Sequence, residues 1–149
     1  MGKALTIGAI DAGAVASTDV VAFDIFSTAL DSLVTERGVR TADSIAAVAT
    51  AVDILFLAVK PHDVPEALQQ IRNSGSDTES LLVISVAAGL TLARLEQEVG
   101  EGARVIRSMP NTPALIGKGA AAFTRGSNAT KGDAATARRL LGAVGVVVE

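Results

Sequence analysis

A continuous apolar run at Ile54–Val59 constrains the fold of this chain more than any other segment. The run does not alternate with polar residues, and it stops at Lys60 and Pro61. This pattern is typical of a strand buried on both faces of a parallel sheet. Proline cannot donate to a ladder, so we expect the strand to end at Pro61. A helix should follow, with Asp63 as its N-cap and Pro65 in its first turn.

Strand and helix patterns alternate along the chain. This alternation predicts an α/β fold with a Rossmann-like, doubly wound, mostly parallel sheet and helices on both faces. The expected strands are 4–10, 20–24, a short one from 39, 54–59, 81–86, 103–107, 120–123 and 144–148. The other expected helices begin near Ser27, Asp43 or Ser44, Thr91 and Asp133. Only residues 11–19 separate the first two strands, and a parallel crossover needs a dozen residues or more. We therefore expect the first crossover helix to be missing.

Composition limits the classes of function. The chain has 149 residues, of which 49% are hydrophobic and 19% charged, as in a single folded domain. The net charge is −3 and no basic run occurs, which argues against nucleic acid as a partner. No cleavable leader or membrane-spanning stretch is evident, so we expect a cytoplasmic protein. With no Cys and one His, a metal site is not expected.

Small or conformationally special residues follow three of the predicted strands. They form the segments Ala58–Pro61, Ala87–Gly89 and Ser108–Ala114. Ligands of open α/β sheets bind at the carboxyl ends of the strands. Small residues there allow close approach to the backbone, and the helix N-termini that follow suit anionic groups. One such segment alone reads as an ordinary turn. The three together predict a binding cleft.

The same strand ends carry a resemblance to a known family. The strings Phe56-Leu-Ala-Val-Lys-Pro61, Ser85-Val-Ala-Ala-Gly89 and Arg107-Ser-Met-Pro-Asn-Thr-Pro-Ala114 resemble the N-terminal domain of pyrroline-5-carboxylate reductases. The resemblance covers residues 19–149. It implies that residues 1–149 are an NAD(P)-binding domain, without the C-terminal helical domain that dimerises and holds substrate. The implied reaction reduces 1-pyrroline-5-carboxylate to L-proline, with NADPH or NADH as the hydride donor.

The resemblance also implies where the cofactor binds. Residues 59–61 would line the adenosine and pyrophosphate side, residues 87–88 the nicotinamide ribose, and residues 110–111 the nicotinamide. The strand-end set is Ala58, Val59, Lys60, Pro61, Ala87, Ala88, Gly89, Pro110 and Asn111. Lys60 could instead be a solvated charge. No catalytic residue can be assigned within this chain, so we expect the isolated chain to be inactive and the whole enzyme to be a homo-oligomer.

The family's glycine-rich turn after the first strand is only partly matched. In one register Gly8, Ala12 and Gly13 occupy that turn, and Asp11 replaces a glycine and faces phosphate. In the other register, residues 11–15 are the tail of the following helix and the turn is deleted. A non-catalytic Rossmann-like module without dinucleotide affinity therefore remains an alternative, as does a related imine or hydroxyacid reductase.

Two polar residues are candidates for the adenosine side. Asp24 ends the second predicted strand, where an acid would accept a hydrogen bond from the ribose 2′-OH and favour NADH. Asp24 could equally cap a helix near Ser27–Thr28. Ser44 is the nearest stand-in for a family Asn on the adenine side. His62 is a weak candidate for a general acid, because it lies in a helix start where any polar residue serves.

Overall fold

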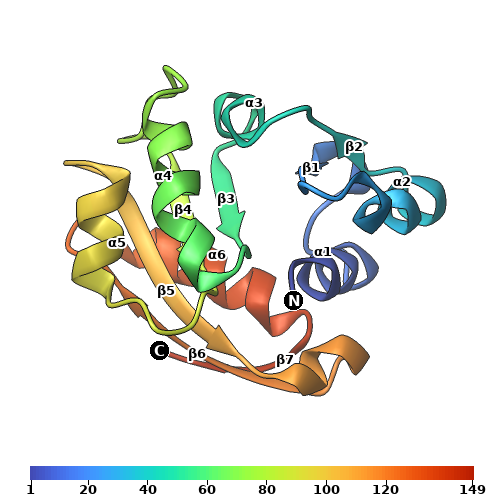
Figure 1. Ribbon diagram of the computed structural model, residues 1–149. Helices are drawn as coiled ribbons and strands as arrows, with labels where there is room; N and C mark the ends of the chain where they lie inside the picture. Colours follow the sequence, from blue (N-terminus) through green and yellow to red (C-terminus); the bar gives the residue numbers. More distant parts are fainter.

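The computed structural model describes residues 1–149 and contains two sheets (Figure 1). The larger sheet has five strands in the order β3-β4-β5-β6-β7, and the smaller one pairs β1 with β2. The strands are β1 (Val21–Ala22), β2 (Arg40–Thr41), β3 (Ile54–Leu57), β4 (Leu82–Ser85), β5 (Arg104–Pro110), β6 (Gly119–Arg125) and β7 (Gly145–Val148). Only the β5–β6 pair is antiparallel. The predicted α/β fold with a mostly parallel sheet is confirmed.

Helices cover both faces of the larger sheet, as predicted. One layer contains α3 (Ile45–Ala51), α4 (Val64–Arg72) and α5 (Leu92–Val99), and the other contains α1 (Gly2–Asp11) and α6 (Lys131–Gly142). α2 (Asp31–Arg37) lies beside α1. Four 3-10 helices complete the chain: η1 (Ser17–Asp19), η2 (Ser27–Ala29), η3 (Pro61–Asp63) and η4 (Thr112–Ile116). None of these helices has the length and apolar character that a membrane crossing requires.

Alternate residues of the central strands feed two separate cores. Val83 and Val105 are fully buried beneath the α3–α5 layer. Their neighbours Ile84 and Ile106 are fully buried on the opposite face, with α1 and α6. The predicted apolar runs therefore lack alternation because both faces of the sheet are covered.

Helix starts follow local capping chemistry. The hydroxyls of Ser44 and Thr91 accept hydrogen bonds from the third helical N–H of α3 and α5. This confirms the predicted cap at Thr91 and selects Ser44 over Asp43 as the cap of α3. Thr130 and Asp133 form a capping box, so α6 begins before Asp133. Asp63 is the N-cap residue of α4 and Pro65 lies in its first turn, as predicted, but the Asp63 side chain makes no capping hydrogen bond.

The start of the second predicted helix is also displaced. Ser27 makes no capping bond and begins the short helix η2, and α2 starts only at Asp31. α2 ends at Gly38, whose φ of 67° is the left-handed conformation that glycine adopts readily after a helix.

The predicted strand at 4–10 is wrong, because these residues belong to the helix α1. Leu5 and Ala9, four residues apart, are both buried and form one helical face. That face packs close to the β7 end of the sheet: a Cβ built on Gly8 would lie 2.2 Å from Val144 Cγ1. The crossover helix expected to be missing is therefore present as α1.

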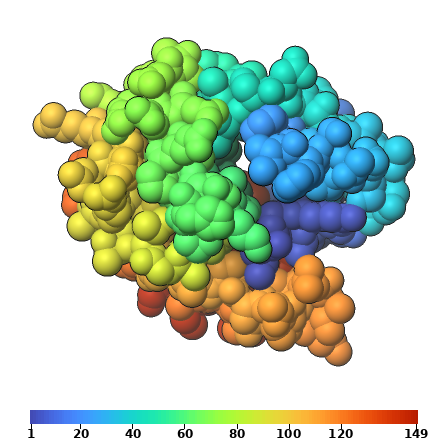
Figure 2. Space-filling view, in the orientation of Figure 1, coloured from blue at the N-terminus to red at the C-terminus, as the bar shows by residue number.

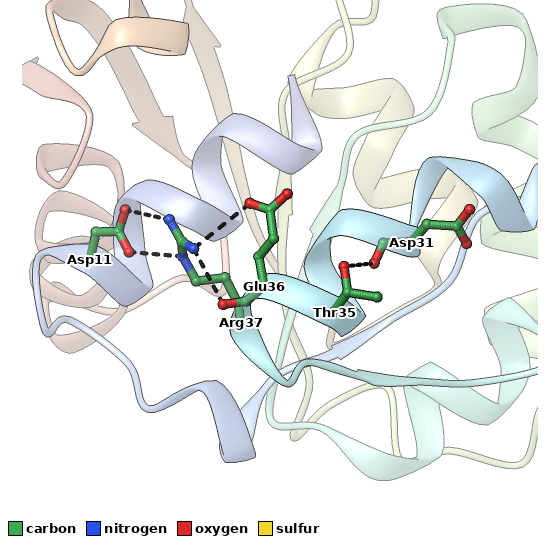
Figure 3. A network of polar contacts seen from close by, with 5 residues as sticks. All are labelled: Asp11, Asp31, Thr35, Glu36 and Arg37. Atoms are coloured by element: carbon green, nitrogen blue, oxygen red, sulfur yellow. Dashed lines mark hydrogen bonds and ion pairs between the residues drawn. The ribbon is translucent and has the colours of Figure 1, made fainter.

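An ion pair fixes the end of α1 to α2 (Figure 3). Arg37 Nε and Nη2 donate to the two carboxylate oxygens of Asp11, at 3.0 and 3.2 Å. This hydrogen bond and the carboxylate charge raise the pKa of Arg37 above its usual value. The negative charge that we expected to face phosphate is thus paired at the carboxyl end of a helix.

Candidate functional site

The carboxyl ends of three parallel strands lie level with one another. Leu57 of β3 pairs with Ser85 of β4, which pairs in turn with Arg107 of β5. The predicted segments after β3 and β4 therefore leave the sheet at the same edge. Ala58, Val59 and Lys60 are exposed there. These strand ends form an open, small-residue edge of the type that binds ligands in α/β sheets.

The turn after β4 leaves room over the backbone. Ala87 is buried, whereas Ala88 and Gly89 are exposed. Gly89 has a φ of +78°, and a Cβ built on it would meet nothing within 4 Å. Thr91 then caps α5, so the turn is held at both ends.

The segment after β5 is organised by Asn111. Its Oδ1 accepts a hydrogen bond from the N–H of Ala120 at 2.8 Å, and its own N–H donates to the Ala120 carbonyl at 3.2 Å. Pro110 is the last residue of β5, and η4 follows at Thr112. Asn111 therefore holds the proline-rich loop against β6, and its side-chain NH₂ group remains available to a ligand.

The N-terminus of α1 lies at the same edge as the end of β3. A Cβ built on Gly2 would lie 3.1 Å from Ala58 Cβ, and no side chain caps this helix. The first N–H groups of a helix have no intrahelical partner and suit an anionic group. We missed this feature because we expected a strand here. Its only signal in the sequence is the i, i+4 pair Leu5 and Ala9.

Comparison with known proteins identifies the family. The model of the family described as "NADP oxidoreductase coenzyme F420-dependent" matches residues 1–89. The chain belongs to this family. Its level strand ends and the α1 N-terminus are therefore those of an NADP oxidoreductase family member.

The similar proteins are longer than this chain. A pyrroline-5-carboxylate reductase of Methanosarcina acetivorans is 38% identical over 149 residues, which cover all of this chain and 54% of that protein. The structure of a pyrroline-5-carboxylate reductase from Coxiella burnetii has a TM-score of 0.92 and 28% identity, and the match covers 99% of this chain and 54% of that one. A Plasmodium falciparum pyrroline carboxylate reductase with NADP bound has a TM-score of 0.82 and 25% identity, and the match covers 100% and 53%. The chain spans about half the length of these relatives.

The three predicted residues of the glycine turn are not part of such a turn. Gly8 lies inside α1 and packs against Val144. Ala12 is the C-cap of α1, and Gly13 follows it with a φ of 67°. The carboxyl end of a helix carries the negative end of the dipole, which repels phosphate. The α1 N-terminus at the opposite end of the helix replaces them in the candidate site for this family member.

The two adenosine-side candidates make local hydrogen bonds. Asp24 Oδ1 accepts from the N–H of Phe26 at 2.9 Å, which closes a tight turn after β1. Phe26 is the N-cap residue of η2 and no side chain caps that helix, so Asp24 is not the helix cap considered near Ser27–Thr28. Ser44 Oγ accepts from Ala47 N–H at 3.1 Å as the cap of α3. Both oxygens retain lone pairs, but neither side chain is free to reorient without losing its bond.

Arg107 was not singled out by sequence reasoning. It lies in the level row between Ser85 and Thr124, and its Nε is buried without a hydrogen-bond partner. A charge directly after the buried pair Val105 and Ile106 is the signal that could have found it. It places an unpaired donor one residue row beneath the exposed strand ends.

A separate cavity of about 510 Å³ lies over α6 and is lined by Arg125, Lys131, Ala134, Ala135, Arg138, Arg139 and Glu149. Arg125 pairs with Ile106, toward the amino end of β5, whereas the candidate site lies at the Pro110 end. Glu149 accepts a hydrogen bond from Arg125 Nε at 2.6 Å and lies 3.7 Å from Arg138. This partly neutralised cavity is not part of the candidate cofactor site.

Proposed function

We propose that this chain is the NADP(H)-binding part of a pyrroline-5-carboxylate reductase, which reduces 1-pyrroline-5-carboxylate to L-proline. The observation that carries the proposal is the set of level strand ends with the uncapped N-terminus of α1 beside Ala58. A dinucleotide needs this combination, because its pyrophosphate is anionic and its sugars lie close to the backbone. The similar reductases support the choice of reaction.

Each strand end has a proposed role toward the cofactor. The first N–H groups of α1 and the ammonium of Lys60 would hold the pyrophosphate, with Ala58, Val59 and Pro61 close to the adenosine. The open turn at residues 87–89 would accept the nicotinamide ribose. Pro110 and the NH₂ group of Asn111 would orient the nicotinamide. When bound, NADPH supplies a hydride to the imine carbon, and the imine nitrogen gains a proton.

We propose NADPH as the preferred cofactor. The family description and the relative with NADP bound support this choice. Asp24, which suggested NADH, holds the N–H of Phe26 and is constrained in that position. Asp24 would therefore weaken the preference without reversing it.

The proposal extends to assembly and location. We propose a cytoplasmic homo-oligomer acting on a small-molecule substrate, as the resemblance implies. Apolar side chains that are exposed on β7 and η4 support an assembly surface, since clustered apolar groups mark interfaces. They are Val146, Val148, Leu115 and Ile116.

Calorimetric titration of the purified chain with NADPH and NADH tests the proposal. We expect saturable binding with NADPH favoured, and a weaker affinity for Lys60→Ala, because one cation near the pyrophosphate is lost. Lys118→Ala is the matched control, since Lys118 is an exposed cation in the loop after η4. A chain that folds but binds neither dinucleotide would favour the alternative of a non-catalytic Rossmann-like module.

A further inference from the structure

Ile25 and Phe26 are apolar side chains that the fold leaves in solvent. They are 77% and 69% exposed, and neither belongs to the two cores. The chain has four Phe and no Trp or Tyr, and the other three Phe pack in or against the cores: Phe23, Phe56 and Phe123. Phe26 is therefore the one aromatic ring that is open to a ligand. Single exposed apolar residues are common, so the position of this pair decides its meaning.

The pair lies at the same edge of the molecule as the candidate cofactor site. α1 begins beside Ala58, at the carboxyl end of β3, and its last residue Asp11 bonds Arg37 at the end of α2. Because α1 and α2 pack side by side, both helices run away from that edge. Phe26 is the N-cap residue of η2, which directly precedes α2, and so lies at its start. In the space-filling view, the blue segment around residue 25 and the green segment around residue 60 share the viewed face (Figure 2).

The backbone of Phe26 is held by two hydrogen bonds. Its N–H donates to Asp24 Oδ1 at 2.9 Å, and its carbonyl accepts from the N–H of Ala29 at 2.8 Å. These bonds fix the position from which the side chain leaves the backbone, while the ring stays in solvent. A ring held in this way needs little ordering when a ligand binds, which lowers the entropic cost of the contact.

The segment that carries Phe26 offers no positive charge to a ligand. No Lys, Arg or His occurs between Lys3 and Arg37. Arg37 is paired with Asp11 at the other end of α2. The turn after β1 therefore suits a flat, uncharged group better than it suits a phosphate.

We propose that the adenine ring of a bound NADPH or NADH stacks on Phe26, with Ile25 as its apolar neighbour. The inference rests on the proposed function of the chain in binding a dinucleotide, whose adenine is the flat, uncharged group that this turn suits. Bases stack on aromatic side chains through their π-faces without needing a charge. Because both cofactors carry the same adenine, Phe26 strengthens the binding of each by the same factor. The choice between them is then made by groups near the ribose 2′ position.

The substitution Phe26→Trp gives an optical test of the stacking. The chain contains no Trp or Tyr, so the new indole is its only such fluorophore. We expect saturating NADP⁺ and NAD⁺ to quench its fluorescence, because the adenine lies on the indole. Nicotinamide mononucleotide, which lacks the adenosine, should not quench it. Val148→Trp is the control, since Val148 is 58% exposed on β7, outside the candidate site, and its indole should be quenched by none of the three.

Calorimetric titration measures how much the ring contributes to affinity. We expect Phe26→Ala to weaken the binding of NADPH and of NADH by about tenfold each, as loss of base–aromatic stacking does. Phe26→Tyr keeps an aromatic ring and should bind both cofactors as the unaltered chain does. Val148→Ala, which shortens another exposed apolar side chain, is the matched control and should change neither affinity. Urea unfolding should show the same stability for all three variants, because both side chains lie in solvent.

The outcomes separate this inference from the proposed function. Unchanged NADPH affinity of Phe26→Ala, or an indole at position 26 that saturating NADP⁺ does not quench, would overturn the stacking and leave the proposed function standing. A loss of affinity confined to NADPH would also overturn it, because the ring would then act through the 2′-phosphate. An unaltered chain that binds neither dinucleotide would overturn the proposed function and the stacking with it.

Discussion

Substitution of Gly8 tests most directly whether residues 2–11 form the helix α1 packed against Val144. In α1, a Cβ added at residue 8 would lie 2.2 Å from Val144 Cγ1, far inside van der Waals contact. Val144 is 3% exposed, so its side chain has little space to move. Overpacking of this kind costs about 1–3 kcal/mol. Replacing Gly by Ala inside a helix returns about 1 kcal/mol. We expect Gly8→Ala to lower the free energy of unfolding by about 1 kcal/mol.

The sign should reverse when the obstructing methyl is removed. In a Val144→Ala background the remaining contacts of the new Cβ are ordinary: 3.4 Å to Ala143 O and 3.6 Å to Val144 Cβ. Gly8→Ala should then stabilise by about 1 kcal/mol, which gives a coupling of about 2 kcal/mol between the two sites. Gly132→Ala in α6, where the nearest contact is Thr130 Oγ1 at 3.4 Å, is the control and should behave alike in both backgrounds.

Urea unfolding followed by circular dichroism measures all four combinations. The coupling is also visible thermally, because 1 kcal/mol shifts the Tm of a chain of this size by about 2–4 °C. An equal effect of Gly8→Ala in both backgrounds would refute the packing of α1 on Val144. If Gly8→Ala changed the affinity for NADPH and left the free energy of unfolding unchanged, Gly8 would belong to a phosphate-binding turn.

Three further changes have expected outcomes. Asp133→Ala removes the capping box and the ion pair with Arg104 (2.8 Å). In urea unfolding it should destabilise the protein by about 2 kcal/mol, more than Thr91→Ala, which removes only a cap and should cost about 1 kcal/mol. Equal losses would contradict the added role of the ion pair. Gly145→Ala should prevent folding as judged by circular dichroism, because its Cβ would lie 1.9 Å from Gly119 O at a φ of 154°. A folded variant would contradict the close approach of Gly119 and Gly145 at the start of β6 and β7. Gly2→Val should weaken NADPH binding at least about tenfold, because the new side chain would press on Ala58 at the α1 N-terminus. The free energy of unfolding should change by only about 0.5 kcal/mol. An unchanged affinity would show that the α1 N-terminus does not contact the cofactor.

The buried strands could be predicted because their signals are local and strong. The run at Ile54–Val59 ends at Lys60-Pro61, and the structure ends β3 at Leu57 and begins η3 at Pro61. The caps at Ser44 and Thr91 were also predictable, since a hydroxyl before an apolar helical pattern has few other uses. These elements define the edge that carries the candidate site.

The start of the chain could not be predicted, because its apolar residues fit two periods. Residues 4–10 contain enough β-branched and apolar residues for a strand, and only packing of Leu5 and Ala9 selects the helix. The antiparallel direction of β6 was likewise not evident, since direction depends on how the loop at 111–118 closes. Asn111 closes the loop by accepting a hydrogen bond from the N–H of Ala120, and no local sequence pattern predicts this bond.

A map of amide chemical shifts during an NADPH titration tests the central claim most directly. We predict that the largest changes fall on the level strand ends and the α1 N-terminus, at Gly2, Ala58–Lys60, Ala88–Gly89 and Asn111. The amides around the cavity over α6, such as those of Lys131 and Arg139, should change little. Changes centred on that cavity, or none at the strand ends at saturating NADPH, would contradict the assignment of the cofactor site.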